Sequence, residues 1–215
     1  MRKAVRVFGE LFITLGLIIL LFATYEIYGK YFEIKAAQNK LESSLDKQWD
    51  QLAENPNATP PENFDIGDGI AKMYVPTLDL NWVVVEGEDP KDIKHAPGHF
   101  RNSALPGQKG NFAVAGHRTP AIFWDLDQID NGDYIGLETF NKWYIYRVYQ
   151  TLVITPDETE VVKPDPDNPD STEPSRSLLT LVTCEPKTDN SHRLVVHAEL
   201  VREQDKPSGK PKELK

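Results

Sequence analysis

The sequence predicts an all-β domain with short helices, preceded by an N-terminal transmembrane helix. Between residues 70 and 200, short runs rich in Val, Ile, Tyr and Leu alternate with Gly, Pro, Asn and Asp, which is the pattern of strands and turns. Near the N-terminus, one long apolar run carries no charge. Many short strands with few helices are typical of a single β-barrel or sandwich.

Residues 1–30 form the expected cytoplasmic tail and membrane anchor. The basic residues Arg2, Lys3 and Arg6 precede an uncharged run at 11–25. As a helix, that run reaches only about 22 Å, so flanking residues must complete a span of roughly 30 Å. Because basic residues stay inside, we expect a single-pass protein of the cell membrane with its N-terminus in the cytoplasm and the rest extracellular. A cleaved signal peptide is the alternative, but no small-x-small cleavage site follows the run.

A helical stalk and a linker are expected at residues 31–63. Apolar residues three and four apart form one stripe of a helix, which either lies against the domain or offers a surface to a neighbour. They are Ile34, Ala37, Leu41, Leu45, Trp49 and Leu52. The Pro- and Asn-rich stretch at 55–63 then predicts a linker.

Residues 64–202 hold the expected β domain. We expect strands at about 70–75, 82–86, 111–116, 133–139, 143–154, 177–184 and 193–200. A short helix is expected over Pro120 to Ile129, and a turn near Pro90 to His95. The segment from Thr155 to Ser175 holds five prolines and seven acidic residues, which predicts a loop. Residues 203–215 form a polar tail that we expect to fray.

Composition excludes several functions. At 215 residues with 40% hydrophobic content, the chain has room for one domain plus attachments. A net charge of −9 argues against a nucleic-acid partner, which needs a basic face. Cys184 is the only cysteine, so neither an internal disulfide nor a Cys-rich metal site can form. A buried core cysteine is the ordinary interpretation of such a residue.

The surroundings of Cys184 favour chemistry instead. It ends one expected strand, Arg193 begins the next, and a turn connects them. In an antiparallel hairpin the two residues face each other, with Cβ atoms about 5 Å apart. A guanidinium beside a thiol favours the nucleophilic thiolate, and it can also donate hydrogen bonds to a carbonyl oxygen that gains negative charge.

A cysteine nucleophile also needs a proton donor for the leaving group, and histidine suits this role near neutral pH. Of the five histidines, His117 directly follows an expected strand and precedes a turn. Side chains at strand ends project into clefts. A solvated or core imidazole remains the ordinary interpretation of any one histidine.

Together these residues resemble the motifs of the sortase family. Ala113-Val-Ala-Gly-His-Arg118 is similar to the family's histidine strand, and Thr180-Leu-Val-Thr-Cys184 matches its TLxTC motif. Arg193 follows at the family's spacing, and Lys72-Met-Tyr-Val-Pro76 resembles the opening strand. The resemblance covers roughly residues 66 to 201.

The resemblance implies an eight-stranded β-barrel and a transpeptidation. In that family the cysteine, here Cys184, attacks the Thr–Gly carbonyl of a C-terminal sorting signal on a surface protein. His117 would give a proton to the leaving glycine amine, and Arg193 would steady the reacting carbonyl. An amine of a peptidoglycan precursor then resolves the thioacyl enzyme. The substrate-binding residues implied are Thr183, Val114, Ala115 and Leu181, although core packing explains the last three equally well.

The anchor, the Cys184-Glu-Pro186 continuation and the stretch His117 to Trp124 are most similar to class E, the housekeeping type of Gram-positive actinobacteria. That class favours an LAxTG signal over LPxTG. It usually has a tyrosine shortly after His-Arg-Thr, where this chain has Pro120-Ala-Ile122, which leaves the signal preference open.

No cofactor is expected. The acidic residues of the 155–175 loop resemble those that bind calcium in one family member, but the chain has no EF-hand pattern, so we expect a solvated loop. The residues concerned are Asp157, Glu158, Glu160, Asp165 and Asp167.

Other functions stay open as alternatives. An L,D-transpeptidase would show Ser-x-Gly-Cys and a papain-like hydrolase Cys-Gly-x-Cys-Trp, and neither run is present. A membrane-tethered adhesion or scaffolding module with an inert cysteine is the alternative from a different class.

Overall fold

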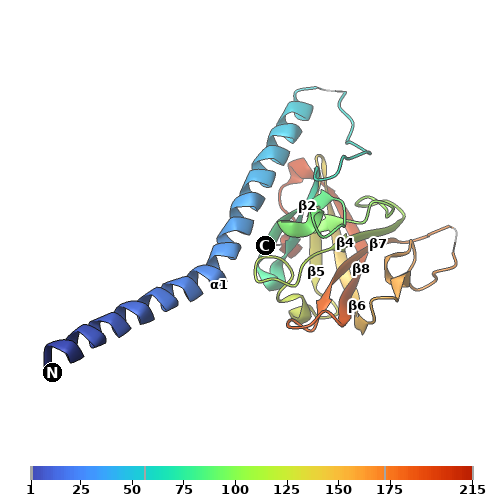
Figure 1. The fold of residues 1–215 in the computed structure, drawn as a ribbon. Helices are drawn as coiled ribbons and strands as arrows, with labels where there is room; N and C mark the ends of the chain where they lie inside the picture. Colours follow the sequence, from blue (N-terminus) through green and yellow to red (C-terminus); the bar gives the residue numbers. More distant parts are fainter. Residues whose placement is uncertain (1, 56, 172, 215) are drawn as a thin grey trace.

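The computed structural model describes residues 2–55, 57–171 and 173–214, apart from the side chains of residues 4 and 26–28. A closed β-barrel forms the body of the molecule, and a long helix extends from it (Figure 1). The strands are β1 (Gly69–Val75), β2 (Leu80–Glu86), β3 (Gly98–His99), β4 (Gly110–Ala115), β5 (Tyr134–Glu138), β6 (Lys142–Ile154), β7 (Ser177–Glu185) and β8 (His192–Asp205). The expected eight-stranded barrel is therefore confirmed.

The strands follow the order β1-β2-β3-β4-β7-β8-β6-β5, and β5 pairs back onto β1 to close the barrel. Two neighbouring pairs, β2–β3 and β4–β7, are parallel, and the others are antiparallel. Because β4 and β7 are parallel, the C-terminal ends of these two strands lie side by side.

Alternation along the strands fills the barrel interior. Since successive side chains of a strand point to opposite faces, every second residue of β4, β7 and β8 reaches the same core. These inward residues are Phe112, Val114, Leu179, Leu181, Leu194, Val196 and Ala198. Each is at most 4% exposed, so the interior is packed with side chains and holds no channel along these strands.

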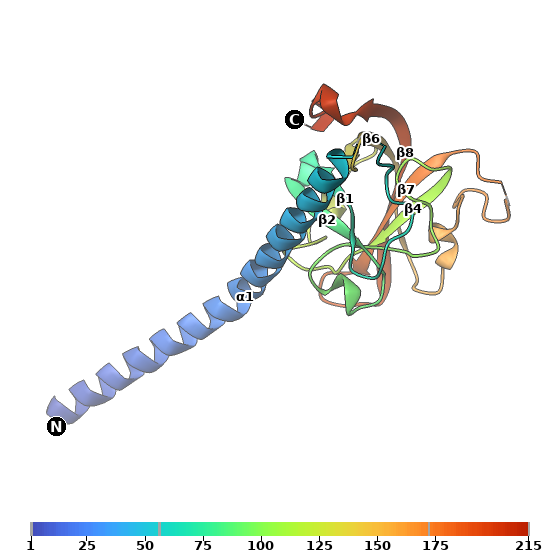
Figure 2. The ribbon, with the colours of Figure 1, turned by 90° about the horizontal axis from the view of Figure 1, so that it is seen from above.

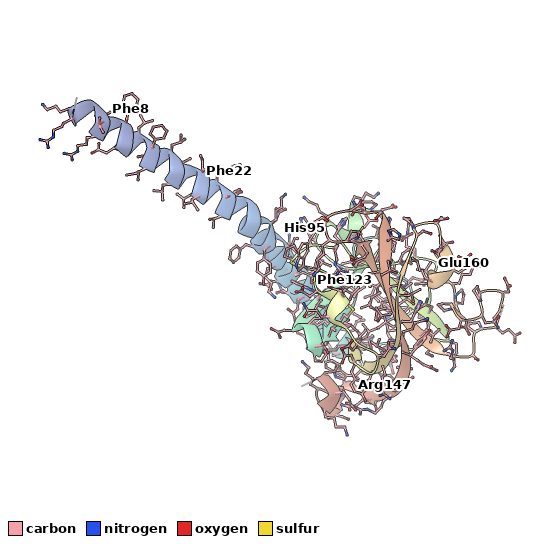
Figure 3. All side chains as sticks on the ribbon, turned by 90° about the horizontal axis from the view of Figure 1, so that it is seen from below. Phe8, Phe22, His95, Phe123, Arg147 and Glu160 are labelled. Carbon is pink, nitrogen blue, oxygen red and sulfur yellow. The ribbon has the colours of Figure 1, made fainter. Side chains whose placement is uncertain are left out.

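The helix α1 (Arg2–Ala53) runs without a break through the expected anchor and the expected stalk. Its N-terminal half extends away from the barrel, and Figure 3 shows Phe8 and Phe22 projecting from it, each 63% exposed. This half is long and apolar enough to cross a membrane, with a mean hydropathy of 2.3 over its most apolar window. Exposure of these apolar side chains to water is unfavourable, and a lipid bilayer would cover them.

The C-terminal half of α1 lies along β1 and β2 (Figure 2). Leu45 and Trp49 pack against Val83 and Val85 of β2. The buried Gln38 accepts a hydrogen bond from the Val83 amide at 2.8 Å and donates to the Val83 carbonyl at 3.3 Å, as a neighbouring strand would. This half of the helix is therefore firmly packed against the outside of the barrel.

Three local expectations differ from the structure. No strand was among those expected at Gly98 and His99, which form no apolar run, yet they form β3 and pair with β2 and β4. The helix expected over Pro120 to Ile129 is a series of turns that ends in the single 3₁₀ turn η3 (Leu126–Gln128). The tail does not fray: β8 continues to Asp205, and the buried Leu214 packs against β6.

The remaining short helices are 3₁₀ turns in connections. They are η1 (Pro76–Leu78), η2 (Asp92–Lys94), η4 (Thr159–Val162), η5 (Lys206–Ser208) and η6 (Lys212–Leu214). η4 belongs to the long β6–β7 connection, which projects on the side of the barrel away from α1 (Figures 1 and 2).

Candidate active site

The hairpin of β7 and β8 brings Cys184 opposite Arg193. The two residues are Cα partners in the antiparallel ladder, as the sequence predicted, and both side chains are half-buried. The next pair toward the turn is Glu185 with His192. The thiol therefore lies at one end of the β7–β8 ladder, where it is partly exposed to solvent.

The parallel pair β4–β7 leads His117 to the same place. Its last paired residues are Ala115 and Val182, and contact continues beyond them. The Gly116 amide donates to the Val182 carbonyl at 3.0 Å, and Thr183 Oγ1 donates to the Gly116 carbonyl at 2.7 Å. Continued for two residues, this register sets His117 beside Cys184.

Cys184 and Arg193 lie on the outer face of the barrel. Leu181 and Thr183 of β7 point inward, so Cys184 points outward; Leu194 of β8 points inward, so Arg193 points outward. His117 lies two residues beyond the end of β4 and is half-buried. The strand ends that carry the thiol, the imidazole and the guanidinium are therefore neighbours.

The backbone after His117 folds back tightly. Its carbonyl accepts hydrogen bonds from the amides of Thr119 at 2.9 Å and Phe123 at 3.2 Å. A Cβ atom on Gly116 would lie 2.3 Å from the ring of the fully buried Phe123, which Figure 3 labels, so only glycine fits there. This packing fixes the point from which the His117 side chain leaves the backbone.

The Arg193 guanidinium rests over the β7–β8 turn. Its Nη1 atom donates to the carbonyls of Asn190 at 2.9 Å and His192 at 2.8 Å. In the part of the chain that the structure describes, these are the hydrogen bonds it makes, and none joins it to Cys184. The geometry suits contact with a substrate carbonyl better than a direct ion pair with the thiolate.

The other histidines have different surroundings. His99 is buried against Glu86, with Nδ1 2.9 Å from the carboxylate, and His95 lies 3.0 Å from Glu33 on α1. His197 is buried on β8, and His192 is exposed in the turn. His117 is the histidine that the strand register brings to Cys184.

The other predicted site residues lie in different environments. Val114 and Leu181 are fully buried in the barrel core, on the opposite face from Cys184, so they support the strands and cannot contact a peptide. Thr183 is 2% exposed, and its hydroxyl joins β7 to Gly116. Ala115 is half-buried on the outer face, where peptide contact remains open to it.

Sequence reasoning did not single out Val182, which lies on the outer face between Ala115 and Val195. Counting back two residues from Cys184 would have found it, because strand residues two apart share a face. Val182 is half-buried, whereas its neighbour Leu181 is fully buried.

The acidic β6–β7 connection is attached to the barrel by side chains. Asn111 of β4 donates to the carbonyls of Val161 and Lys163, both at 3.1 Å. Arg176 binds Asp165 at 2.9 Å and also contacts Asp167. Within the described residues, no group of three or more His, Cys, Asp or Glu is arranged to hold a metal ion.

A cavity of about 670 Å³ lies between the end of α1, the linker and the β5–β6 turn, lined by Trp49, Phe64 and Tyr144 among others. It is at the opposite end of the barrel from Cys184 and contains none of the three candidate residues. The candidate chemistry is therefore on the strand ends and not in this cavity.

Comparisons with known proteins agree with this arrangement. The sortase domain family matches residues 73–201. Sortase SrtE1 of Streptomyces coelicolor is 32% identical over 97% of this chain, which spans 60% of that relative's length. The structure of sortase E from Streptomyces avermitilis is 36% identical, with a TM-score of 0.62 over 71% of this chain and 100% of that one.

A third similar structure is sortase E1 from Streptomyces coelicolor with a tripeptide in the active site. It is 30% identical, with a TM-score of 0.63 over 71% of this chain and 99% of that one. Most of the barrel, including all three candidate residues, lies within the matched family domain. The chain therefore belongs to the sortase family, whose members are cysteine transpeptidases, and within it the chain most resembles class E.

Proposed function

We propose that this protein cleaves a C-terminal sorting signal between Thr and Gly and transfers the protein that bears it to an amine of a peptidoglycan precursor. One observation carries the proposal. The register of β7 and β8 sets Cys184 opposite Arg193, and the β4–β7 pairing ends at Ala115 and Val182, two residues before His117 and Cys184.

In the first half-reaction the Cys184 thiolate adds to the threonine carbonyl. Negative charge develops on the carbonyl oxygen, where the Arg193 guanidinium stabilises it. When the Thr–Gly bond breaks, protonated His117 gives its proton to the leaving glycine amine. The product is a thioester between Cys184 and the surface protein.

In the second half-reaction the precursor amine attacks that thioester. His117, now neutral, accepts the proton that the amine loses, and Cys184 leaves as the thiolate. The enzyme returns to its starting state, so no cofactor is consumed and none is required. A peptide ligand agrees with the related sortase E1 whose structure holds a tripeptide in its active site.

The membrane anchor suits such substrates. We propose that the basic N-terminus stays in the cytoplasm and that the barrel faces the cell exterior, where precursor amines and surface proteins are. The half of α1 that packs on the barrel would then hold the active site near the membrane. Calcium is not expected to contribute, because Arg176 already pairs with Asp165 and Asp167.

Peptide assays test the proposal. The full chain in detergent would be incubated with LAxTG and LPxTG peptides and candidate amines, with and without EDTA, and the products identified by mass spectrometry. We expect amine-dependent ligation after the threonine, unaffected by EDTA. If neither peptide is cleaved while Cys184 is reduced and the protein is folded, the proposed function is wrong.

A further inference from the structure

Arg118 places a buried positive charge directly after the proposed proton donor. Only 3% of its side chain is exposed, and Nη2 lies 2.7 Å from Asp127 Oδ1 and 3.3 Å from Glu185 Oε2. Burying a guanidinium is costly unless carboxylates compensate its charge. Arg118 and its two partners therefore hold one another in fixed positions.

These partners belong to the two proposed catalytic strand ends. Arg118 follows His117, and Glu185 follows Cys184. Glu185 lies in β7 directly after Cys184, so its side chain points to the opposite side of the strand from the thiol. The contact between Arg118 and Glu185 therefore joins the segment after His117 to the end of β7.

A second cation strengthens the same connection. Lys187, in the turn after β7, lies 3.4 Å from Asp125 and 3.2 Å from Asp127, with its ammonium 5.1 Å from the ring centre of Trp124. Asp127 thus contacts both Lys187 and Arg118. The turn that follows the nucleophile is held to the segment that follows the histidine.

The cluster is not optimised for stability alone. Among the described residues, Arg118 Nε and Arg118 Nη1 are buried without a hydrogen-bond partner, and Glu185 Oε2 contacts Arg118 as an ion pair that makes no hydrogen bond. Each unpartnered nitrogen costs about 1–3 kcal/mol. A buried charge retained at this cost, between two catalytic strand ends, is typical of a functional constraint.

We propose that Arg118 and Glu185 form a brace that sets the separation of His117 from Cys184. Arg118 is then a positioning residue: it touches neither substrate nor reacting atoms, and it acts by holding the strand end that carries the imidazole against the one that carries the thiol. This role rests on the proposed transpeptidation. An error of about 1 Å in the position of a catalytic group is enough to lower a rate about 100-fold.

Kinetics of three variants test the brace. Arg118→Met removes the charge with little change of bulk, Glu185→Gln keeps the shape but weakens the pair, and Arg118→Lys keeps the charge without the planar fork. Each would be assayed as the full chain, with kcat and KM measured on the sorting-signal peptide. Thermal melts would show whether each variant is folded. Titration of Cys184 with iodoacetamide would give the fraction of the protein whose thiol is reactive.

Arg118→Met and Glu185→Gln should each lower kcat about 10- to 100-fold per reactive thiol, with KM changed less than about 3-fold. Arg118→Lys should lie between Arg118→Met and the wild type. The double variant should be no slower than the slower single variant, because both changes break one connection. A loss of stability alone would leave kcat per reactive thiol unchanged.

Arg202→Met is the control for loss of an arginine–glutamate pair elsewhere in the barrel. Arg202 also pairs with a glutamate, Glu213, but it lies on β8 nine residues beyond Arg193, at the far end of the barrel. Its kcat should stay within about 2-fold of the wild type. If folded Arg118→Met and Glu185→Gln also keep wild-type kcat, the brace is refuted. Should Arg118→Met not fold, Glu185→Gln decides alone. Failure of the transpeptidation itself would appear differently, as an inactive wild type.

Discussion

The inner and outer faces of β4, β7 and β8 differ in what they require of a side chain. On the inner face, residues such as Phe112, Leu181 and Val196 are at most 1% exposed and fill the core. On the outer face of the same strands are Cys184 and Arg193, which are half-buried and polar or reactive. Alternate residues of each strand therefore fill the core or carry the side chains proposed to act in catalysis.

This comparison shows how narrowly the site is specified. A shift of one residue in the β4–β7 register would move every side chain of a strand to the other face. The hydrogen bond from Thr183 to Gly116 holds this register at the strand ends. The inward side chain of Thr183 therefore fixes the positions of the two residues that follow this bond, His117 and Cys184.

The largest effect is expected from the outer face. Cys184→Ala should abolish cleavage and transfer, because no other thiol exists in the chain, and His117→Ala should be nearly as severe. Both variants should melt within a few degrees of the wild type, since neither side chain belongs to the core. Mass spectrometry of peptide products and thermal melts check this. Residual transfer by Cys184→Ala would refute the covalent mechanism.

Arg193 should rank next. Arg193→Ala removes a donor to the developing oxyanion and should lower kcat about 100-fold or more. Arg193→Lys should recover little of this, because lysine has no planar fork. Steady-state kinetics with the sorting-signal peptide measures both variants. Near-normal turnover of Arg193→Ala would show that the guanidinium has no electrostatic role.

A neighbouring pair of residues sharpens the comparison of faces. Leu181→Ala should lower the free energy of unfolding by about 2–5 kcal/mol while leaving kcat/KM of the folded protein nearly unchanged. Val182→Asp should lower kcat/KM while leaving the free energy of unfolding nearly unchanged, because an outward carboxylate there alters the surface beside Cys184 but opens no core cavity. Urea denaturation and kinetics are measured on both. If both variants lose stability to the same extent, the assignment of faces is wrong.

The sequence predicted the barrel strands well because alternation and turn residues mark them locally. The strand β3 was not predicted, because its two residues, Gly98 and His99, are too few to show the alternation of a strand. The segment Pro120 to Ile129 has apolar residues at helical spacing, but they pack under Gly116 as turns. Tertiary contact decided both cases.

The candidate site likewise contains residues that local motifs predict and a contact that they do not. Short motifs identified Cys184, His117 and Arg193, because each lies at a strand end with recognisable neighbours. The contact of Arg118 with Glu185 joins residues far apart in sequence, and no local pattern reports it. Local sequence therefore indicates the candidate reactive groups, and only the fold shows which side chains contact the segments that carry them.

A smaller effect, on stability, is expected from His197, which lies on a buried part of the outer face. His197 stacks on Tyr149, and its Nδ1 atom lies 2.8 Å from Thr180 Oγ1, which donates its own hydrogen to Asn111. The imidazole Nδ1 must then be the donor. Burial lowers the pKa of His197 to about 4 from its ordinary value near 6.5.

The lowered pKa of His197 makes stability depend on pH. Between about pH 6.5 and pH 4, the unfolded chain binds a proton at this residue that the folded chain does not, so stability falls as the pH decreases through this window and levels off below it. From pH 7.5 to pH 5 the loss should be about 2 kcal/mol. Urea denaturation at both pH values measures it, and His197→Gln should remove this part of the loss, because glutamine has no proton to gain. If the variant loses as much stability as the wild type, the pH dependence comes from other groups. Burial of His197 on the outer face would then make no contribution to the change of stability with pH.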